Sequence, residues 1–438
     1  MNASSERPHR PALLLGFFLL LHVLNQVDRN LIASFGPEIV RDLGLTRTQF
    51  GIVTGIAFTA FYAVTALAAG VLADRYGRTR ILAVGLGVWS AFTALSGAAR
   101  GFLSLVALRP FVATGEATLI PAATAILSER FPAARRATAI GIFFMGVPLG
   151  VGASFFLAGQ LGPVLGWRGV FVLLGLLGLV FVAGVLALKD RRTPGAHDEE
   201  LPERTAAAVL ADLGRELRSN SDLRLSLAGA VLMHVYLAGG PFVKLWLVEE
   251  RGFAGDQIAV TYGAMVVVFG VIGAALGGTM ADWYARRFRG GRAMFLALFV
   301  AMLAPLIIAF RFADPGSLLF YAGMAAGILF FSSFYGPAFA VMQSVTPQRL
   351  HASVTGLSML LVNVLALGIG GLVIGIASDA LIARGSQDAL SLPLIIADLV
   401  SLLTILCFAR IGWRKWRATQ NEGENWRLAI KTERQSEC

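Results

Sequence analysis

The stretch GVLADRYGR, from Gly70 to Arg78, lies between two long apolar runs and indicates how the whole chain is organised. A degenerate copy, GTMADWYAR, spans Gly278 to Arg286 and again separates two apolar runs. The copies begin at positions 70 and 278, so they are 208 residues apart in a chain of 438 residues. A short charged turn used once in each half of an apolar chain predicts a duplicated bundle of membrane-spanning helices.

The composition supports a membrane protein and excludes several other classes. Hydrophobic residues make up 56% of the chain and the mean hydropathy is +0.70, whereas soluble domains are roughly 45–50% apolar. The net charge of +10 does not indicate nucleic-acid binding, because the basic residues are spread over short loops instead of forming one face. Cys407 and Cys438 have no plausible nearby partner, so we expect no disulfide and no thiolate metal site.

Twelve apolar runs are long enough to cross a bilayer, which predicts an all-α membrane protein with two pseudo-symmetric six-helix bundles. Between the bundles, a polar segment carries a short amphipathic helix from Glu203 to Arg218, which we expect to lie on the membrane face. The predicted organisation is an N-terminal bundle in 1–188, a cytoplasmic linker in 189–222, a C-terminal bundle in 223–412 and a cytoplasmic tail in 413–438. The spans are predicted near 11–34, 48–73, 80–98, 102–127, 137–160, 168–188, 225–248, 257–281, 293–311, 317–344, 353–377 and 391–410.

The distribution of Lys and Arg predicts the orientation. If the N-terminus is cytoplasmic, most of the 37 basic residues fall in cytoplasmic segments and few in outer loops. This asymmetry is the positive-inside rule, so both termini are expected in the cytoplasm.

Several stretches resemble the major facilitator superfamily of transporters. The turn at Gly70–Arg78 resembles the superfamily signature between spans 2 and 3, and Arg109 and the span 5 sequence GVPLGVG resemble two further motifs. Within the superfamily the chain resembles the spinster-like group, except that Ala113 stands where that group usually has glycine. The residues that carry this narrower resemblance are Asp28-Arg29, Trp89, Gly115-Glu116-Ala117 and the phrase GIFFMGVPLGVG from Gly141.

The resemblance implies a secondary transporter of the bacterial inner membrane that moves an amphipathic lipid-type substrate, such as a lysophospholipid or sphingoid compound. The anion:cation symporters share VDRN-like and LGWRGVF-like stretches, here at 27–30 and 165–171, so a small organic anion is the alternative substrate. A non-transporting membrane sensor on the same scaffold is an alternative of another class.

Four charged residues are predicted deep in the membrane: Asp28, Arg29, Arg109 and Glu116. A charge at the centre of a spanning helix costs on the order of 3 kcal/mol, so such residues are paired or line a wet cavity. By residue count Asp28 and Arg109 both lie roughly 10 Å below the outer surface, where they could form an ion pair, and Glu116 is two turns deeper. We hypothesise that Asp28 and Glu116 carry a transported proton, while Arg29 and Arg109 stabilise their charged forms or bind an anionic substrate group. The alternative is a static ion pair that only fixes helix packing.

Other polar residues within the spans are candidates for contact with substrate, although each is equally explained as an interhelical hydrogen bonder. His22 and Asn25 share a stripe of span 1 with Arg29. Lys244 lies near the outer end of span 7, where snorkelling to the interface is expected and attraction of an anionic head group is the sharper role. The remaining cavity candidates are Tyr62, Thr65, Tyr236, Ser332, Ser333, Tyr335 and Asn363.

The repeated turn predicts a cytoplasmic gate. Gly70 allows close helix packing, Asp74 can face the N-terminal end of a neighbouring helix, and Arg78 can bridge to Glu129 at the end of span 4. Asp282 and Arg286 are expected to repeat this arrangement in the second half.

Enzymatic motifs are missing from the sequence. It contains no GxxxxGK[ST] phosphate loop and no HExxH motif, and no Ser-His-Asp arrangement stands out. We therefore expect no catalysis, no metal and no cofactor other than protons as the coupling ion. The expected partners are the lipid bilayer and a small-molecule or lysolipid substrate, and the expected state is a monomer.

Overall fold

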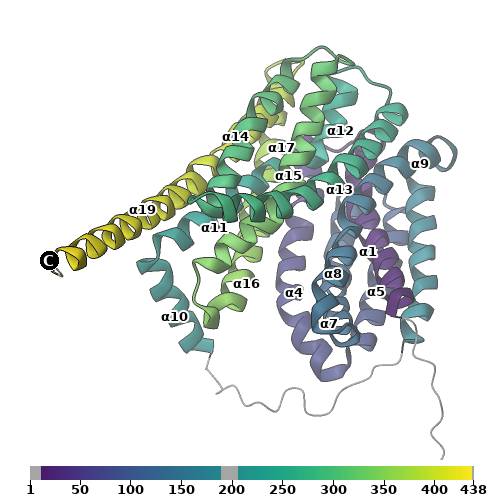
Figure 1. The fold of residues 1–438 in the computed structure, drawn as a ribbon. Helices are drawn as coiled ribbons and strands as arrows, with labels where there is room; N and C mark the ends of the chain where they lie inside the picture. The colour runs from purple at the N-terminus through teal and green to yellow at the C-terminus, as the bar shows by residue number, and fades with distance from the viewer. Residues whose placement is uncertain (1–10, 189–205, 437–438) are drawn as a thin grey trace, which may run out of the picture. The chain divides into compact units, whose positions relative to one another are not determined.

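The computed structural model describes residues 11–188 and 206–436, and every regular element in those ranges is helical (Figure 1). The first half contains α1 (Pro11–Ser34), α2 (Gly36–Leu43), α3 (Arg47–Thr54), α4 (Ile56–Tyr76), α5 (Arg78–Ser96), α6 (Phe102–Glu116), α7 (Leu119–Arg130), α8 (Ala133–Phe144) and α9 (Gly146–Leu186). The second half contains α10 (Ala206–Ser219), α11 (Ser221–Ala238), α12 (Gly240–Glu249), α13 (Gly255–Arg287), α14 (Gly291–Phe312), α15 (Leu318–Ser344), the 3-10 turn η1 (Gln348–Leu350), α16 (His351–Leu361), the π-helix η2 (Val362–Ile369), α17 (Gly370–Ala383), α18 (Ser391–Leu402) and α19 (Thr404–Ser436).

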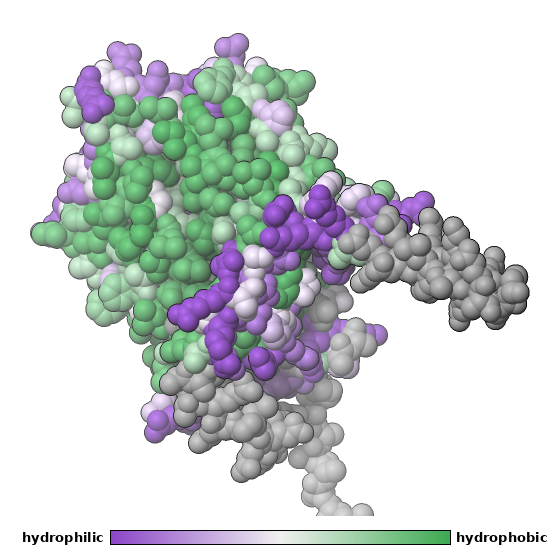
Figure 2. Space-filling view, turned by 90° about the vertical axis from the view of Figure 1, so that its left-hand side faces the viewer, coloured by the Kyte–Doolittle hydropathy of each residue, from purple (hydrophilic) through white to green (hydrophobic). Residues whose placement is uncertain are grey.

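Eleven segments of the described chain are long and apolar enough to cross a membrane. One of them, Thr138–Leu186, has 49 residues, which as a single helix would be about 74 Å long against a hydrocarbon core of about 30 Å. Gly166 divides it, because its φ of 65° and ψ of 170° are not helical. The segment therefore holds two crossings, consistent with the twelve predicted. Large parts of the face shown in Figure 2 are hydrophobic, as a lipid-facing surface requires.

Contacts between residues divide the chain into two compact units, each assembled from separate stretches. The first unit contains the described residues up to 188 together with Leu237–Val271 and Met359–Ala397. The second contains residues 206–236, together with Ile272–Ser358 and 398–436. Segments from the second half of the sequence thus pack with the first half inside the first unit.

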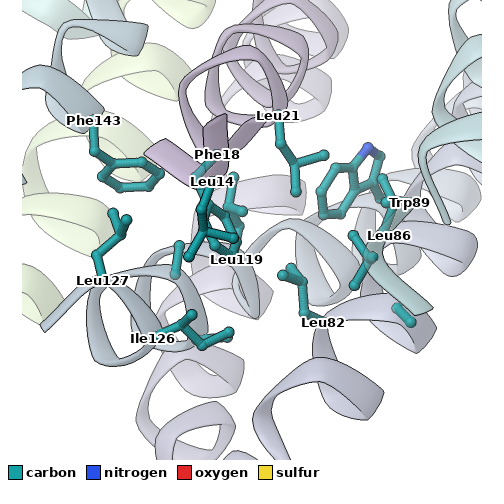
Figure 3. Packing of buried hydrophobic residues seen from close by; sticks show 14 of the residues in the cluster. Leu14, Phe18, Leu21, Leu82, Leu86, Trp89, Leu119, Ile126, Leu127 and Phe143 are labelled. Atoms are coloured by element: carbon teal, nitrogen blue, oxygen red, sulfur yellow. The ribbon is translucent and has the colours of Figure 1, made fainter. Parts of the chain in front are cut away.

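The core of the first unit is built where α1 packs against α5, α7 and α8 (Figure 3). The backbones of α5 and α6 also approach closely in this unit: a Cβ added to Gly115 would lie only 2.5 Å from the carbonyl oxygen of Gly85. The buried side chains drawn in Figure 3 include Leu14, Phe18 and Leu21 of α1, Leu82, Leu86 and Trp89 of α5, Leu119, Ile126 and Leu127 of α7, and Phe143 of α8.

The two copies of the charged turn differ in structure. In the first, α4 ends at Tyr76 and α5 begins at Arg78, because Gly77 adopts a φ of 98°. Ala285 stands at the position that matches Gly77, and α13 continues to Arg287. The second turn forms only before Gly291, which has a φ of 63°. The expectation of a turn within Gly278–Arg286 is therefore wrong, since a residue with a Cβ does not readily adopt positive φ.

The linker helix is confirmed as α10 within the described residues, while 203–205 of the predicted range lie outside them. Part of its apolar stripe packs against other helices of the second unit. Leu213 is buried in a cluster that Leu217 also contacts, whereas Leu210 is 67% exposed. The other buried members of the cluster are Leu223, Leu227, Met342, Leu350 and Val354.

The bend in α9 contacts the end of α2 and the loop after α5 through Trp167 and Arg168 of the LGWRGVF stretch. Trp167 donates a hydrogen bond from Nε1 to Oδ2 of Asp42 at 2.8 Å, and Arg168 forms an ion pair with the same carboxylate. Arg168 also donates to the carbonyl oxygen of Ala99 at 2.8 Å. The hydrogen bonds from Arg168 and Trp167 hold the pKa of Asp42 below its ordinary value.

Candidate functional site

Two acidic side chains lie deep in the first unit. Asp28 is on α1 and is 2% exposed, and Glu116 is the last residue of α6 and is 1% exposed. Among the described residues, none of their four carboxylate oxygens forms a hydrogen bond. The close contact of Gly115 with α5 brings Glu116 to the helix that carries Trp89, and Trp89 and Thr93 lie beside Asp28. Two carboxyl groups thus lie in the protein interior without the formed hydrogen bonds that normally satisfy such groups, and the side chains of Trp89 and Thr93 are the donors beside Asp28.

Two guanidinium groups share an aromatic ring next to these acids. The guanidinium carbon of Arg29 lies 4.8 Å from the ring centre of Phe58 and 4.6 Å from that of Tyr62. Arg109 lies over Phe58 at 4.6 Å and donates from Nε to the carbonyl oxygen of Val53 at 3.2 Å. A cation over an aromatic face is stabilised without a carboxylate partner. Arg29 and Arg109 are therefore held in place while their charges still act on the nearby acids.

The ion pair that the sequence suggested between Asp28 and Arg109 does not form in this structure. The Asp28 carboxylate has no hydrogen bond, and Arg109 uses its Nε on a backbone carbonyl. The charges of Asp28, Arg29 and Glu116 nevertheless all act on Arg109. The four residues are brought together as an electrostatic cluster without direct carboxylate hydrogen bonds.

His22 has hydrogen-bond partners at both ring nitrogens, whereas the side-chain nitrogen of Asn25 has none among the described residues. The Nδ1 of His22 lies 2.9 Å from the carbonyl oxygen of Phe143, and its Nε2 lies 3.3 Å from the side-chain nitrogen of Gln26. Its ring also stacks on Phe143 at 4.4 Å between centroids, so both ring nitrogens are used and the residue packs α1 against α8. Asn25 is 3% exposed and its Nδ2 has no partner among the described residues, so it is a second unsatisfied polar side chain on α1 beside Asp28.

Three of the other candidates lie in the first unit. Tyr62 stacks on Phe58 and faces Arg29 as described above. Thr65 donates to the hydroxyl of Thr114 at 3.3 Å. Asn363 is 6% exposed and lies in the π-helix η2, where Nδ2 donates to a backbone carbonyl but Oδ1 has no partner. π-helical segments occur frequently at functional sites, so Asn363 stays a candidate.

Four candidates lie in the second unit. Tyr236 packs edge-on against Phe330, and its hydroxyl lies only 2.0 Å from where a Cβ on Gly327 would stand. Ser333 is buried and its hydroxyl has no partner, while Ser332 is partly buried beside Gly273. The hydroxyl of Tyr335 lies 3.1 Å from Nε2 of His234, a buried histidine that the sequence analysis missed.

The buried position of Lys244 contradicts the prediction that its side chain reaches the membrane interface. Its side chain is 2% exposed, and Nζ donates to the carbonyl oxygen of Ser34 at 2.6 Å and to the carboxylate of Glu38 at 3.0 and 3.2 Å. Snorkelling to the interface is therefore wrong, because the ammonium group has a buried carbonyl and a carboxylate within reach.

Further contacts within the first unit join α3, from the first half of the sequence, to α12 and α17 from the second half. Arg47 pairs with Glu249 at 2.5 Å, and the carboxylate of Asp379 accepts hydrogen bonds from the backbone nitrogens of Arg47 at 2.9 Å and Thr48 at 2.8 Å. Glycines allow the backbones to touch: a Cβ on Gly51 would lie 2.5 Å from the carbonyl oxygen of Gly371. The ends of α1, α3, α12 and α17 are thus locked together.

The predicted gate residues are only partly described. Arg78 forms an ion pair with Glu129. Gly70 and Asp74 belong to α4, but their surroundings lie outside the described part of the structure. The prediction that Asp282 and Arg286 repeat the arrangement of Asp74 and Arg78 needs correction. Asp282 accepts from Nε of Arg292 at 2.7 Å, and Arg286 is exposed because α13 extends past it.

A buried ion pair in the second unit contradicts the expectation that all deep charges lie in the first half. Arg311 at the end of α14 donates from Nε to Oδ2 of Asp398 on α18 at 2.7 Å. Both side chains are 3% exposed. The sequence feature that could have predicted this pair is Asp398 itself, an aspartate within the last apolar run.

Residues 18–371 match the family model of the major facilitator superfamily. The chain belongs to this superfamily. It is 27% identical over 409 residues to an MFS-type efflux pump of Mycolicibacterium smegmatis, covering 93% of this chain and 94% of that protein. It is 28% identical over 355 residues to the hexuronate transporter of Bacillus subtilis, covering 79% and 83%. Protein spinster of Drosophila melanogaster is 27% identical over 300 residues, covering 66% of this chain and 48% of spinster.

Solved structures agree with this assignment. A bacterial homologue of the human lysosomal transporter Spinster, in an inward-facing and unoccupied conformation, superposes with a TM-score of 0.78. It is 22% identical, and the alignment covers 93% of this chain and 97% of that one. The chain is therefore a multi-pass membrane transporter with the major facilitator fold, and not an enzyme.

Proposed function

We propose that this transporter moves an amphipathic, lipid-like substrate with an anionic group and couples the movement to protons. In this proposal it works by rocker-switch alternating access in the bacterial inner membrane, as a monomer with both termini in the cytoplasm. The observation that carries the proposal is the pair of buried carboxyl groups, Asp28 and Glu116, which form no hydrogen bonds with other described residues and lie within electrostatic reach of Arg29 and Arg109.

Proton coupling follows from the energetics of those acids. A buried carboxylate without hydrogen bonds is costly, and binding a proton removes the charge and the cost. When the site opens to water the charged form is solvated and the proton can leave. A group whose proton affinity differs between closed and open states ties proton movement to the conformational cycle.

The substrate class follows from the cations and the rings around them. Arg29 and Arg109 rest on Phe58 and Tyr62 without direct carboxylate partners, so a guanidinium can accept a phosphate or carboxylate of the substrate. An anion bound there also competes with the acids for positive charge, which couples substrate binding to protonation. The lipid-like part of the substrate rests on the resemblance of the sequence motifs to the spinster-like group.

A small organic anion is the second candidate, with a specific observation in its favour. Similar curated proteins include the hexuronate transporter and the probable galactarate/D-glucarate transporter of Escherichia coli, the latter 28% identical over 289 residues. The substrates named for both proteins are carboxylates, which the same two guanidinium groups could bind.

Uptake into proteoliposomes separates these candidates. Purified protein is given lysophosphatidylglycerol, a sphingoid base or glucuronate, each with and without an inward proton gradient. The proposal expects gradient-dependent movement of the lysolipid. Movement of glucuronate alone would favour the organic-anion candidate, and no movement of any compound would favour a sensor.

A further inference from the structure

A group of basic side chains without acidic partners lies where α13 turns into α14. Arg286, Arg287 and Arg289 are all exposed, and the described part of the structure gives none of them an ion pair. Two exposed cations of α19, Lys415 and Arg417, likewise have no acidic partner among the described residues. We call these five residues the basic turn cluster.

The packing of α14 on α19 brings the two parts of the cluster together (Figure 1). A Cβ on Gly412 would lie 2.7 Å from the backbone nitrogen of Met294, so α19 touches the backbone of α14. A Cβ on Gly291 would lie 3.0 Å from Nζ of Lys415, which places that ammonium directly over the first residue of α14. Glycine at both positions is what allows Lys415 to join the arginines of the turn.

Nearby acids are already used by other cations. Asp282 pairs with Arg292 at 2.7 Å, and Asp222 pairs with Arg414 at 2.6 Å. These two pairs neutralise themselves and leave the basic turn cluster with its positive charge. A structural role in ion pairing therefore explains Arg292 and Arg414 but not the five remaining cations.

Exposed aromatic rings accompany the cluster. Trp283 is 56% exposed, Phe288 47% and Trp413 42%. Trp413 stacks on Trp416 with centroids 5.1 Å apart, and the guanidinium of Arg417 lies 5.3 Å from the Trp413 ring centre. Aromatic rings beside cations at the ends of spanning helices are typical of the level of lipid headgroups.

Exposed apolar side chains continue along the same two helices. Leu298 is 52% exposed and Met302 64% on α14, Leu406 is 66% exposed on α19, and Leu403 directly before α19 is 47% exposed. A lipid can therefore place its headgroup at the cluster and its acyl chains along these helices. A free phosphate would use only the cations.

We propose that the basic turn cluster binds the headgroup of an anionic phospholipid. The guanidinium and ammonium groups donate charge-assisted hydrogen bonds to the phosphodiester, and the exposed rings lie at the glycerol level. The bound lipid is a component of the membrane surface and is distinct from the transported substrate, since the cluster belongs to the second unit and the acids Asp28 and Glu116 to the first.

Native mass spectrometry of the purified full-length protein tests the proposal. Dioleoylphosphatidylglycerol is added, with dioleoylphosphatidylcholine and glycerol phosphate as the other two arms. The test variant is R289Q/K415Q, and R135Q/R136Q removes the same charge from exposed arginines at the start of α8. A second variant, R287Q/R417Q, serves if the first is not monodisperse.

The proposal predicts that wild type retains phosphatidylglycerol in preference to phosphatidylcholine, and that R289Q/K415Q loses this retention by roughly tenfold or more. The control variant keeps it, and glycerol phosphate does not displace the lipid. Equal loss in both variants would show general charge attraction, and no preference in wild type would show that these cations only set topology. Displacement by glycerol phosphate would show a phosphate site and would also overturn the proposal.

Discussion

The ammonium group of Lys244 lies 3.0 Å from the carboxylate of Glu38 and 2.6 Å from the carbonyl oxygen of Ser34. Ser34 is the last residue of α1, the helix that carries Asp28, and Glu38 lies on α2. Lys244 lies on α12 in the second half of the sequence. One buried cation therefore connects the end of the helix with the candidate proton site to the other half of the chain.

Replacing Lys244 with Met should open this end of the first unit. The Glu38 carboxylate and the Ser34 carbonyl lose their donor, which costs roughly 1–3 kcal/mol, and the closed arrangement becomes less populated. The readout is maleimide labelling of a cysteine at Val53, which is fully buried, in a chain whose Cys407 and Cys438 are replaced by Ser. Faster labelling in K244M than in the parent is expected, and E38Q should act in the same direction. Equal labelling rates in K244M and the parent would show that Lys244 does not hold this end of the first unit closed.

A methyl group at Gly152 should prevent the closed packing. A Cβ there would lie 2.6 Å from the carbonyl oxygen of Gly263, whereas a Cβ on Gly141 would meet nothing within 4 Å. Alanine at an unobstructed helical position is favoured over glycine by up to about 1 kcal/mol. G141A is therefore expected to unfold at the same temperature as wild type or a higher one, and G152A at a lower one. A G152A protein as stable and as active as G141A would show that this backbone contact is unimportant.

The first charged turn should depend on Gly77. With a φ of 98°, alanine there is strained by roughly 1–2 kcal/mol. Gly87 is on the following helix, and a Cβ there meets only one side-chain atom, at 3.9 Å. Thermal unfolding in detergent should show a clear decrease for G77A and none for G87A. Indistinguishable curves would contradict the assignment of the turn to this glycine.

The buried pair of Arg311 and Asp398 should stabilise the fold without contributing to coupling. Removing one partner of a buried pair leaves an uncompensated charge and costs about 3–5 kcal/mol, whereas replacing both with apolar residues recovers most of it. D398N should lower the unfolding temperature, and R311M/D398L should restore it. The double variant is expected to keep the pH dependence of transport. A changed pH dependence in that variant would assign the pair to coupling.

Much of the architecture can be predicted from apolar runs and charged turns, because a lipid environment demands long apolar helices. The depth of Asp28 and Glu116 follows from counting residues along a helix. The electrostatic neighbourhood of Arg109 could be predicted in the same way. Its hydrogen bond to the Val53 carbonyl could not, because backbone carbonyls within helices leave no signal in the sequence.

Pairings between distant segments could not be predicted. Lys244 and Glu38 are 206 residues apart, and an isolated lysine near a span end is ordinarily explained by the interface. Arg311 stands at the end of its helix, so its burial depends on Asp398, which is 87 residues away. The later turn after α13 could have been predicted, because Ala285 replaces the glycine that the first copy uses.

Substrate-driven proton movement measures the central claim most directly. Proteoliposomes loaded with a pH-sensitive dye receive lysophosphatidylglycerol, and the rate of acidification is compared for wild type, E116Q, D28N and the control D314N, which removes an exposed acid in the loop after α14. The account predicts proton movement in wild type and D314N. In E116Q or D28N it predicts substrate movement that no longer carries protons or responds to a proton gradient. Wild-type proton movement in both E116Q and D28N would contradict it.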